Sequence, residues 1–303
     1  MYNIELGKSG LSVPTVAVGC MRIGGMTELE ASRFVETCLE NGANFFDHAD
    51  IYGGGQSEVV FGKAISSVRD KVLIQTKCGI VPGKMFDFSF DHIINSVDGS
   101  LKRLATDHID VLLLHRPDAL VDPEEVAKAF DLLKSSGKVS HFGVSNQNPY
   151  QIELLQSYLD MPLCANQLQL SIMHAPMIQA GINVNMCNDS AVNRDGGVLD
   201  YCRLHNITIQ PWSPMQFGFF EGCFVDHEKF PRLNQVLLEI AEKYSVTKTT
   251  IAIAWLLRHP AKMQPITGTT NLSRLRESFD ASNVKLSKEE WYKIYMAAGN
   301  ILP

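Results

Sequence analysis

Residues 111–146 read VLLLHRPDALVDPEEVAKAFDLLKSSGKVSHFGVSN, and this stretch holds one strand–helix–strand repeat. The apolar run at 111–115 predicts a buried parallel strand, because strands that are covered on both faces lack polar alternation. Asp122 is followed by a proline and two glutamates, a pattern that predicts the start of a helix. Gly137 predicts its end. A second strand is expected at 142–145. Parallel strands joined by a helix are the unit of α/β folds.

The same unit recurs along the whole chain. Strands are predicted near residues 15–18, 44–47, 72–77, 111–115, 142–145, 164–168, 208–212 and 265–267. Helical patterns with capping residues lie between them. They include helices that begin at Thr27 and Asn148, and two helices in 231–259 that are divided near 245–247. Eight units without a break in composition predict an α/β fold, a (β/α)8 TIM barrel, as a single domain over residues 1–303.

Three segments fall outside the eight units. Residues 2–13 predict an N-terminal hairpin before the first barrel strand, and residues 287–299 predict an extra C-terminal helix. The stretch 171–197 is long, rich in asparagine and without clear periodicity. Because long loops in compact domains are usually functional or mobile, we expect it to be a loop on the substrate side.

Composition and charge narrow the possible partners. The net charge of the 303-residue chain is −6 and no basic run reverses it, so we expect no nucleic-acid partner. The N-terminus lacks an apolar signal segment, and no apolar stretch reaches the length of a membrane span. The seven cysteines form no CxxC pair, which predicts reduced thiols and a cytoplasmic protein. We expect a monomer.

The usual nucleotide and metal motifs are missing. The glycine-rich stretch 19–25 has neither GxGxxG spacing nor the lysine of a phosphate-binding loop, which argues against a Rossmann fold. The sequence contains no HExxH. His48 follows Asp47 directly, and we interpret it as a supporting side chain rather than a metal ligand.

Ionisable side chains stand where three predicted strands end. Asp47 ends the second strand, Lys77 the third and His115 the fourth, and Tyr52 lies a few residues into the loop after the second. Active sites of TIM barrels gather at these strand ends. Each residue alone is equally well explained as part of a buried ion pair or as a satisfied core polar group. All four together at adjacent strand ends indicate an acid–base site.

The four side chains have complementary chemistry. A free tyrosine has a pKa of about 10, and a nearby ammonium lowers it. Lys77 is expected to supply that ammonium for Tyr52, and Asp47 to hold Lys77 charged and in place. His115 is expected to orient a substrate carbonyl by hydrogen bonding.

The segments FFDHADIYGGG, VLIQTKCGI, DVLLLHRPD and FGVSN resemble the aldo-keto reductase superfamily, in particular a bacterial branch of NADPH-dependent oxidoreductases. The resemblance runs from the N-terminal hairpin to the helix at Arg274. It implies a (β/α)8 barrel, NADP(H) as cofactor and a catalytic tetrad of Asp47, Tyr52, Lys77 and His115.

The resemblance also implies contacts to the nicotinamide half of the cofactor. Ser145, Asn146 and Gln167 would hold the carboxamide, which needs both donors and acceptors. Trp212 would stack on the nicotinamide, although core packing is the alternative. The loop that covers the pyrophosphate would consist of Ser213, Pro214, Met215, Gln216, Phe217 and Gly218. Met21 and Arg22 follow the first strand and are expected to face the pocket. Arg22 would meet either an anionic substrate or a loop carbonyl.

The segment after the eighth strand suits a phosphate, because it offers hydroxyls at the N-terminus of a helix. Arg274 matches the family residue that binds the 2′-phosphate, or else is a solvated charge. The implied contacts are Gly268, Thr269, Thr270, Arg274, Glu277 and Ser278. Gly268 departs from the family pattern, which often has lysine there, and this weakens the preference for NADPH over NADH.

The sequence therefore predicts an NADP-dependent aldo-keto reductase that reduces aldehydes or ketones, with Tyr52 as general acid. One alternative is an NADPH-binding sensor or regulatory subunit with little turnover, a role that some members of the superfamily have. A hydrolase using Asp47 and His115 fits less well, because it leaves Lys77 without a role. The aromatic residues Phe217, Phe219, Phe220 and Phe224 line a substrate pocket or pack in the core, and the sequence does not separate these two possibilities.

Overall fold

The centre of the molecule is an eight-stranded parallel sheet. A computed structural model describes the whole chain, residues 1–303. The strands, in spatial order, are β11 (Thr208–Trp212), β10 (Leu163–Gln169), β9 (Val139–Ser145), β8 (Ile109–Leu114), β5 (Leu73–Cys78), β4 (Phe45–Asp47), β3 (Ala17–Gly19) and β12 (Ile266–Thr267). All eight predicted strands are present.

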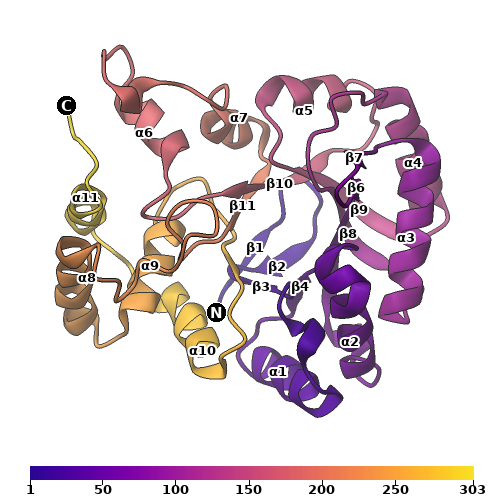
Figure 1. Ribbon diagram of the computed structural model, residues 1–303, viewed down its shortest axis with the longest axis horizontal. Helices are drawn as coiled ribbons and strands as arrows, with labels where there is room; N and C mark the ends of the chain where they lie inside the picture. The colour runs from indigo at the N-terminus through magenta and orange to yellow at the C-terminus, as the bar shows by residue number, and fades with distance from the viewer.

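The sheet curls into a nearly closed barrel. The amide of Gln264, just before β12, donates to the carbonyl of Ile209 in β11 at 3.0 Å, which links the two ends of the sheet. Figure 1 shows the strands at the centre with helices on the outside. The predicted (β/α)8 fold is confirmed.

The helices begin at the predicted caps. Thr27 caps the first helix in a capping box with Glu30, and Asp122, Asn148 and Ser287 cap later ones. The helices are α1 (Glu28–Glu40), α2 (Gln56–Ala64), α3 (Phe90–Leu104), α4 (Pro123–Ser135), α5 (Pro149–Gln156), α6 (Pro176–Ile182), α7 (Val198–His205), α8 (Pro231–Tyr244), α9 (Lys248–Leu257), α10 (Leu272–Asp280) and α11 (Lys288–Ala297). Short 3-10 turns are η1 (Ile23–Gly25), η2 (Tyr52–Gly55), η3 (Arg69–Lys71), η4 (Asp189–Ala191) and η5 (Ala281–Asn283). None of the helices is both long enough and apolar enough to cross a membrane.

The N-terminal hairpin covers one end of the barrel. Its strands β1 (Asn3–Glu5) and β2 (Ser12–Pro14) pair antiparallel, as predicted. Leu6 and Val13 are fully buried and pack with barrel residues that include Phe45 and Val111. The hairpin thus seals the amino-terminal end of the strands. The end that the βα loops surround is left as the place for a site.

The C-terminal helix α11 is the predicted addition after the eighth unit. Trp291 in α11 stacks on Trp255 in α9, with ring centroids 4.7 Å apart and planes within 7°. Each indole N–H donates to the backbone carbonyl of the other tryptophan, at 3.1 and 3.0 Å. These paired contacts fix α11 to the barrel, because buried indole groups need a hydrogen-bond partner.

Two segments differ from the expectation. Residues 171–197 are not an irregular loop throughout, since they contain α6 and η4. The short helix has too few turns to show a clear period in the sequence. A second small hairpin, β6 (Ile80–Val81) and β7 (Met85–Phe86), follows β5 and was not predicted, because two-residue strands carry no alternation.

Candidate active site

The predicted tetrad comes together at the carboxyl ends of neighbouring strands. Asp47 is the last residue of β4, Lys77 lies near the end of β5, and His115 directly follows β8. The strands β4, β5 and β8 are adjacent in the sheet. Tyr52 opens the 3-10 turn η2 after β4. Strand order alone therefore explains why side chains distant in sequence meet.

Lys77 is the centre of the cluster. Its ammonium is completely buried and lies 2.8 and 2.9 Å from the two carboxylate oxygens of Asp47. It also donates to the backbone carbonyl of His48 at 2.6 Å and to the hydroxyl of Tyr52 at 3.2 Å. Burial alone would lower the pKa of Lys77, but Asp47 and Tyr52 raise it, and the net shift is upward. Lys77 is therefore a fixed positive charge.

Tyr52 differs from the expectation in one respect. The sequence predicted that Lys77 lowers the pKa of this phenol. Lys77 does act in that direction, but burial outweighs it and the net pKa of Tyr52 is raised above its ordinary value. Tyr52 thus keeps its proton at neutral pH, which suits a proton donor rather than a base.

His115 faces Tyr52 across the site. The two rings meet edge to face, with centroids 5.9 Å apart. Burial, with help from Lys77 and Arg116, holds the pKa of His115 well below its usual range. The imidazole is therefore neutral and carries one N–H, which can donate to a carbonyl oxygen.

Asp47 is anchored by glutamines that sequence reasoning did not single out. Gln75 and Gln167 each donate to its Oδ1, at 2.6 and 3.0 Å. Gln75 and Gln210 exchange two hydrogen bonds across the barrel, at 3.0 and 3.1 Å. Gln210 then donates to Gln264 at 2.9 Å, and Gln264 to the carbonyl of Pro14 at 2.7 Å. A chain of buried amides thus connects the carboxylate of Asp47 with the N-terminal hairpin.

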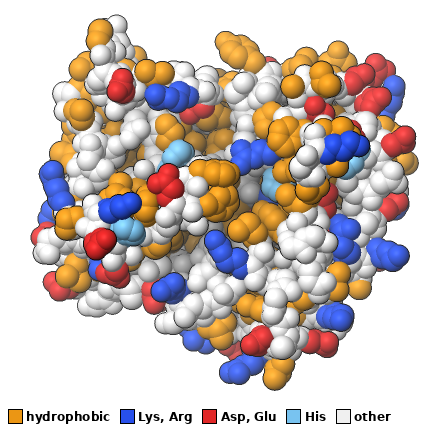
Figure 2. Space-filling model, viewed as in Figure 1, with side chains coloured by type: hydrophobic (Ala, Val, Ile, Leu, Met, Phe, Trp, Pro, Cys, Tyr) orange, Lys and Arg blue, Asp and Glu red, His pale blue; other side chains and the backbone are white.

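A cavity of about 1130 Å³ opens beside this cluster. The face shown in Figure 2 is hollowed near its centre, and both basic and hydrophobic side chains gather around the hollow. The volume lies slightly above the usual range for small-ligand sites. Of the tetrad, Asp47, Tyr52 and His115 line the cavity, whereas Lys77 lies behind them.

The residues expected to hold the carboxamide lie together on the wall of the cavity. Ser145 donates to the carbonyl of Gln167 at 3.0 Å, and Asn146 donates to the hydroxyl of Ser145 at 2.7 Å. The indole N–H of Trp212 donates to the side chain of Asn146 at 3.1 Å. All four line the cavity, so Trp212 is not a core residue.

Some residues of the loop after β11 line the cavity, and others pack away from it. Of its predicted contacts, the cavity is lined by Ser213, Pro214, Met215 and Gln216. Phe217 and Gly218 do not line it. Phe217 is buried and packs edge to face on Phe230, and the carbonyl of Gly218 accepts a hydrogen bond from Gln169. The prediction that these two residues contact a cofactor gains no support from their positions.

The open question about the loop's other aromatic residues is answered separately for each. Phe220 lines the cavity and stacks near Trp212, with centroids 6.1 Å apart. Phe219 is exposed and Phe224 is fully buried in the core. None of the residues 171–197 lines the cavity, but the segment follows the carboxyl end of β10, and Ser171 donates to the carbonyl of Gln216 in the cavity wall at 2.7 Å. A role of this segment beside the substrate stays a prediction.

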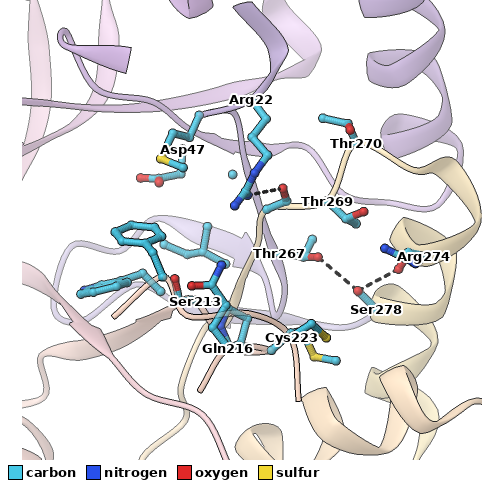
Figure 3. A pocket seen from close by; sticks show the side chains of 18 of the residues that line it. Arg22, Asp47, Ser213, Gln216, Cys223, Thr267, Thr269, Thr270, Arg274 and Ser278 are labelled. Atoms are coloured by element: carbon cyan, nitrogen blue, oxygen red, sulfur yellow. Dashed lines mark hydrogen bonds between the residues drawn. The ribbon is translucent and has the colours of Figure 1, made fainter. Parts of the chain in front are cut away.

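The other end of the cavity lies against α10. The predicted contacts that line it are Gly268, Thr269, Thr270, Arg274, Glu277 and Ser278. Thr267 and Ser278 share a hydrogen bond at 3.1 Å, and Ser278 donates to the carbonyl of Arg274 at 2.9 Å (Figure 3). The Arg274 guanidinium makes no hydrogen bond or ion pair with another side chain.

Sequence reasoning missed part of this end. Thr247, Lys248 and Thr249, at the start of α9, line the same cavity. Lys248 forms an ion pair with Asp226 of the loop after β11. The sequence marks Thr247 as the residue that caps α9, but this feature indicates only where the helix begins and not that it lines a cavity.

Arg22 joins two loops above the cavity. Its guanidinium donates to the carbonyl of Gly268 at 2.9 Å, linking the loop after β3 to the loop after β12 (Figure 3). Of the two roles considered for Arg22, contact with a loop carbonyl is the one observed. Met21 also lines the cavity, as predicted.

His48 is a buried supporting residue. Its ring packs on Phe61 with centroids 4.4 Å apart, and neither ring nitrogen has a hydrogen-bond partner. Burial lowers its pKa to about 3. No group of three or more His, Cys, Asp or Glu side chains is placed to hold a metal ion.

A protonated phenol, a buried lysine–aspartate pair and a neutral imidazole at the mouth of a (β/α)8 barrel define an acid–base site. Residues 15–297 match the model of the aldo/keto reductase family. The chain is 37% identical to 6-dehydroglucose reductase of Agrobacterium fabrum and 36% identical to oxidoreductase YdhF of Escherichia coli, with 98% of each chain covered in both comparisons.

The fold agrees with a solved structure of the same family. The thermostable aldo-keto reductase Tm1743, crystallised with the inhibitor epalrestat, superposes with a TM-score of 0.79 at 28% identity. The match covers 98% of this chain and 100% of that one. The chain therefore belongs to the aldo/keto reductase family, a family of oxidoreductases.

Proposed function

We propose that the protein reduces aldehydes or ketones to alcohols with NADPH and that Tyr52 donates the proton. One observation carries the proposal: the Tyr52 hydroxyl lies 3.2 Å from a Lys77 ammonium that Asp47 holds in place. A phenol that stays protonated at neutral pH, beside a fixed positive charge, can release its proton to an alkoxide as that charge develops.

The residues present fit a nicotinamide dinucleotide. Ser145, Asn146 and Gln167 offer donors and acceptors for an amide, and Trp212 presents an aromatic face beside them. At the far end, the unpartnered Arg274 lies in the N-terminal turn of α10, an arrangement that suits a phosphate. When bound, NADPH would supply the hydride to the carbonyl carbon.

The chain's own residues would do the remaining work. His115, neutral, donates a hydrogen bond that orients and polarises the substrate oxygen. Tyr52 protonates that oxygen. Lys77 stabilises the phenolate that remains, and Asp47, held by Gln75 and Gln167, keeps Lys77 from moving. A hydrolase is disfavoured because both carboxylate oxygens of Asp47 are already engaged with Lys77.

The test compares Tyr52→Phe with Tyr150→Phe, a control at an exposed position on α5. NADPH consumption is followed with a panel of aldehydes and ketones, with NADH as a second donor. The panel includes 6-dehydroglucose, on which the relative from Agrobacterium fabrum acts by name. We expect Tyr52→Phe to lower turnover by about 10²-fold or more and the control to match the wild type.

Two results would contradict the proposal. Full activity of Tyr52→Phe would remove the phenol from the mechanism. Tight NADPH binding by the wild type, without turnover on any carbonyl, would favour a sensor or regulatory subunit. NADPH dependence itself is checked by Arg274→Gln, which we expect to weaken NADPH binding while leaving NADH binding unchanged.

A further inference from the structure

The cavity is lined by three arginines: Arg22, Arg116 and Arg274. Arg22 donates to the carbonyl of Gly268. Arg274 stands at the end beside α10, where the proposed cofactor has its phosphate. Arg116 directly follows His115 and has no role in the proposed mechanism.

Arg116 lies at the catalytic end of the cavity. Its guanidinium carbon is 5.6 Å from the centre of the Trp212 ring. The charge of Arg116 contributes to the low pKa of His115, and Tyr52 acts in turn on the pKa of Arg116. Arg116 lines the same cavity as Tyr52 and His115, so its charge acts on both groups that would contact the substrate carbonyl.

No carboxylate of the protein neutralises this arginine. Three acidic residues line the cavity, and each is engaged elsewhere. Asp47 pairs with Lys77, Asp226 pairs with Lys248, and Glu277 accepts from the hydroxyls of Thr247 and Ser273. The guanidinium of Arg116 makes no hydrogen bond or ion pair with another residue, and it lies near the Trp212 ring.

An unpaired cation in this setting is costly to maintain. The side chain is half-buried, and burial is the main cause of its lowered pKa. The guanidinium carbon lies 5.6 Å from the centre of the Trp212 ring, a cation–π distance, and the indole N–H of Trp212 donates to Asn146. The guanidinium therefore lines the cavity beside His115 with its donors free for a ligand.

We propose that Arg116 binds a carboxylate of the substrate, so that the enzyme prefers carbonyl compounds that carry an acidic group. A guanidinium fork matches a carboxylate in two parallel hydrogen bonds. The ligand would supply the negative charge that the cavity lacks at this end. This inference rests on the proposed carbonyl reduction and names the substrate class of the same site.

The experiment compares acids with their neutral counterparts. The pairs are 4-carboxybenzaldehyde with methyl 4-formylbenzoate, and succinic semialdehyde with butanal, and kcat/KM is measured for each. The variants are Arg116→Gln, Arg116→Lys and Lys128→Gln, the last removing one exposed positive charge on α4 as a control.

We expect the wild type to favour the acid of each pair by about 10- to 100-fold, the range of a charge-assisted hydrogen bond. Arg116→Gln should reduce this ratio to near one, Arg116→Lys should keep part of it, and Lys128→Gln should leave it unchanged. Raising the salt concentration should also reduce the ratio in the wild type.

A binding measurement keeps the inference testable without turnover. Calorimetry of 4-(hydroxymethyl)benzoate and its methyl ester, with NADPH-loaded protein, should show the same preference and the same loss in Arg116→Gln.

Three outcomes would overturn the inference. The first is a wild-type ratio near one, and the second is an acid preference that survives in Arg116→Gln. The third is a loss of kcat/KM in Arg116→Gln that is as large for neutral glyceraldehyde as for the acids. This result would indicate that Arg116 binds substrate hydroxyls instead. A wild type that reduces no carbonyl compound, acidic or neutral, would contradict the proposed function itself. The calorimetric preference would then still test Arg116 alone.

Discussion

Asp47 illustrates how much of the site depends on residues that never touch a substrate. Its Oδ1 accepts from Gln75 and Gln167 as well as from Lys77. Gln210 supports Gln75 from the opposite wall of the barrel. Because all these groups are buried, removing one leaves the others with unpaired polar atoms, which is the costly case.

Gln75→Leu and Gln210→Leu should each lower the free energy of unfolding by about 1–3 kcal/mol. Because the two amides bond to each other, the double variant should lose less than the sum, with a coupling of about 0.5–3 kcal/mol. Urea unfolding measures all three. Gln235→Leu, on the exposed face of α8, is the matched control and should change little. Strictly additive losses would show that the amide pair is not a unit.

His48 should make the stability of the protein sensitive to acid. Its pKa is about 3 in the folded protein, below the ordinary value of 6.5. Between these pH values His48 is protonated in the unfolded chain but neutral in the folded protein. The free energy of unfolding therefore falls as the pH drops below about 6.5. From pH 7 to pH 5 the loss from His48 is about 2 kcal/mol.

The measurement is urea unfolding of wild type and His48→Leu at pH 7 and at pH 5. The variant keeps the backbone carbonyl that Lys77 bonds. We expect its stability to fall less than that of the wild type over this range. Parallel pH dependence in the two proteins would mean that His48 is not buried in its neutral form.

That Asp47, Tyr52, Lys77 and His115 lie together could be predicted from sequence, because they stand at or soon after the ends of apolar runs, where ionisable groups are conspicuous. The direction of the Tyr52 pKa shift could not, because it depends on how burial compares with the charge of Lys77. Arg116 carries no local signal, since an arginine after a strand is common. Its lack of a partner depends on the three carboxylates of the cavity being engaged with other groups, which is a property of the folded chain.

Among the elements, the N-terminal hairpin packs tightly against the barrel at Gly7. Gly7 has φ +58°, and a Cβ there would lie 2.3 Å from the carbonyl oxygen of Cys164. Its amide donates to Thr208 at 2.8 Å, and its carbonyl accepts from Asn206 at 3.1 Å. The backbone at this position therefore requires glycine for two reasons, its conformation and its close approach to β10.

Gly10 provides a matched comparison in the same hairpin. It also has positive φ, +75°, but nothing lies within 4 Å of its Cβ position. Gly10→Ala should cost about 1–2 kcal/mol, for conformation alone. Gly7→Ala should cost about 1–3 kcal/mol more, because the contact with Cys164 must shift. Thermal or urea unfolding measures the stability lost in each variant. Equal losses in Gly7→Ala and Gly10→Ala would contradict the packing argument.

The barrel strands and most helices could be predicted because burial on both faces and capping residues leave clear signals. The short elements could not. The hairpin β6–β7 has strands of two residues, and α6 has seven. Such segments depend on tertiary contacts, which no local pattern records.

At the scale of the whole molecule, the sequence predicted the architecture because each strand–helix unit repeats the same pattern. It did not predict which loops and helices line the cavity together. Lys248 and Thr247 come from α9, Arg22 from the first loop and Arg274 from α10, yet they line one space. Only the closed arrangement of the barrel brings these distant segments to a common mouth.

The sealed amino-terminal end has a consequence for the order of events in each turnover. Because the hairpin covers that end, both ligands must use the mouth at the other. Ser145 and Gln167, which would hold the nicotinamide, are buried in the wall, whereas Arg116 in the same cavity is half-exposed. A carbonyl compound that arrived first would block the path of the dinucleotide.

Steady-state kinetics should therefore be sequential and ordered, with NADPH binding first and NADP⁺ leaving last. NADP⁺ should inhibit competitively against NADPH, and the alcohol product should not. Competitive inhibition of NADPH by the alcohol would show that the two ligands reach their places independently. An ordered scheme would mean that the protein stands ready in cells as a complex with the dinucleotide, awaiting only the carbonyl compound.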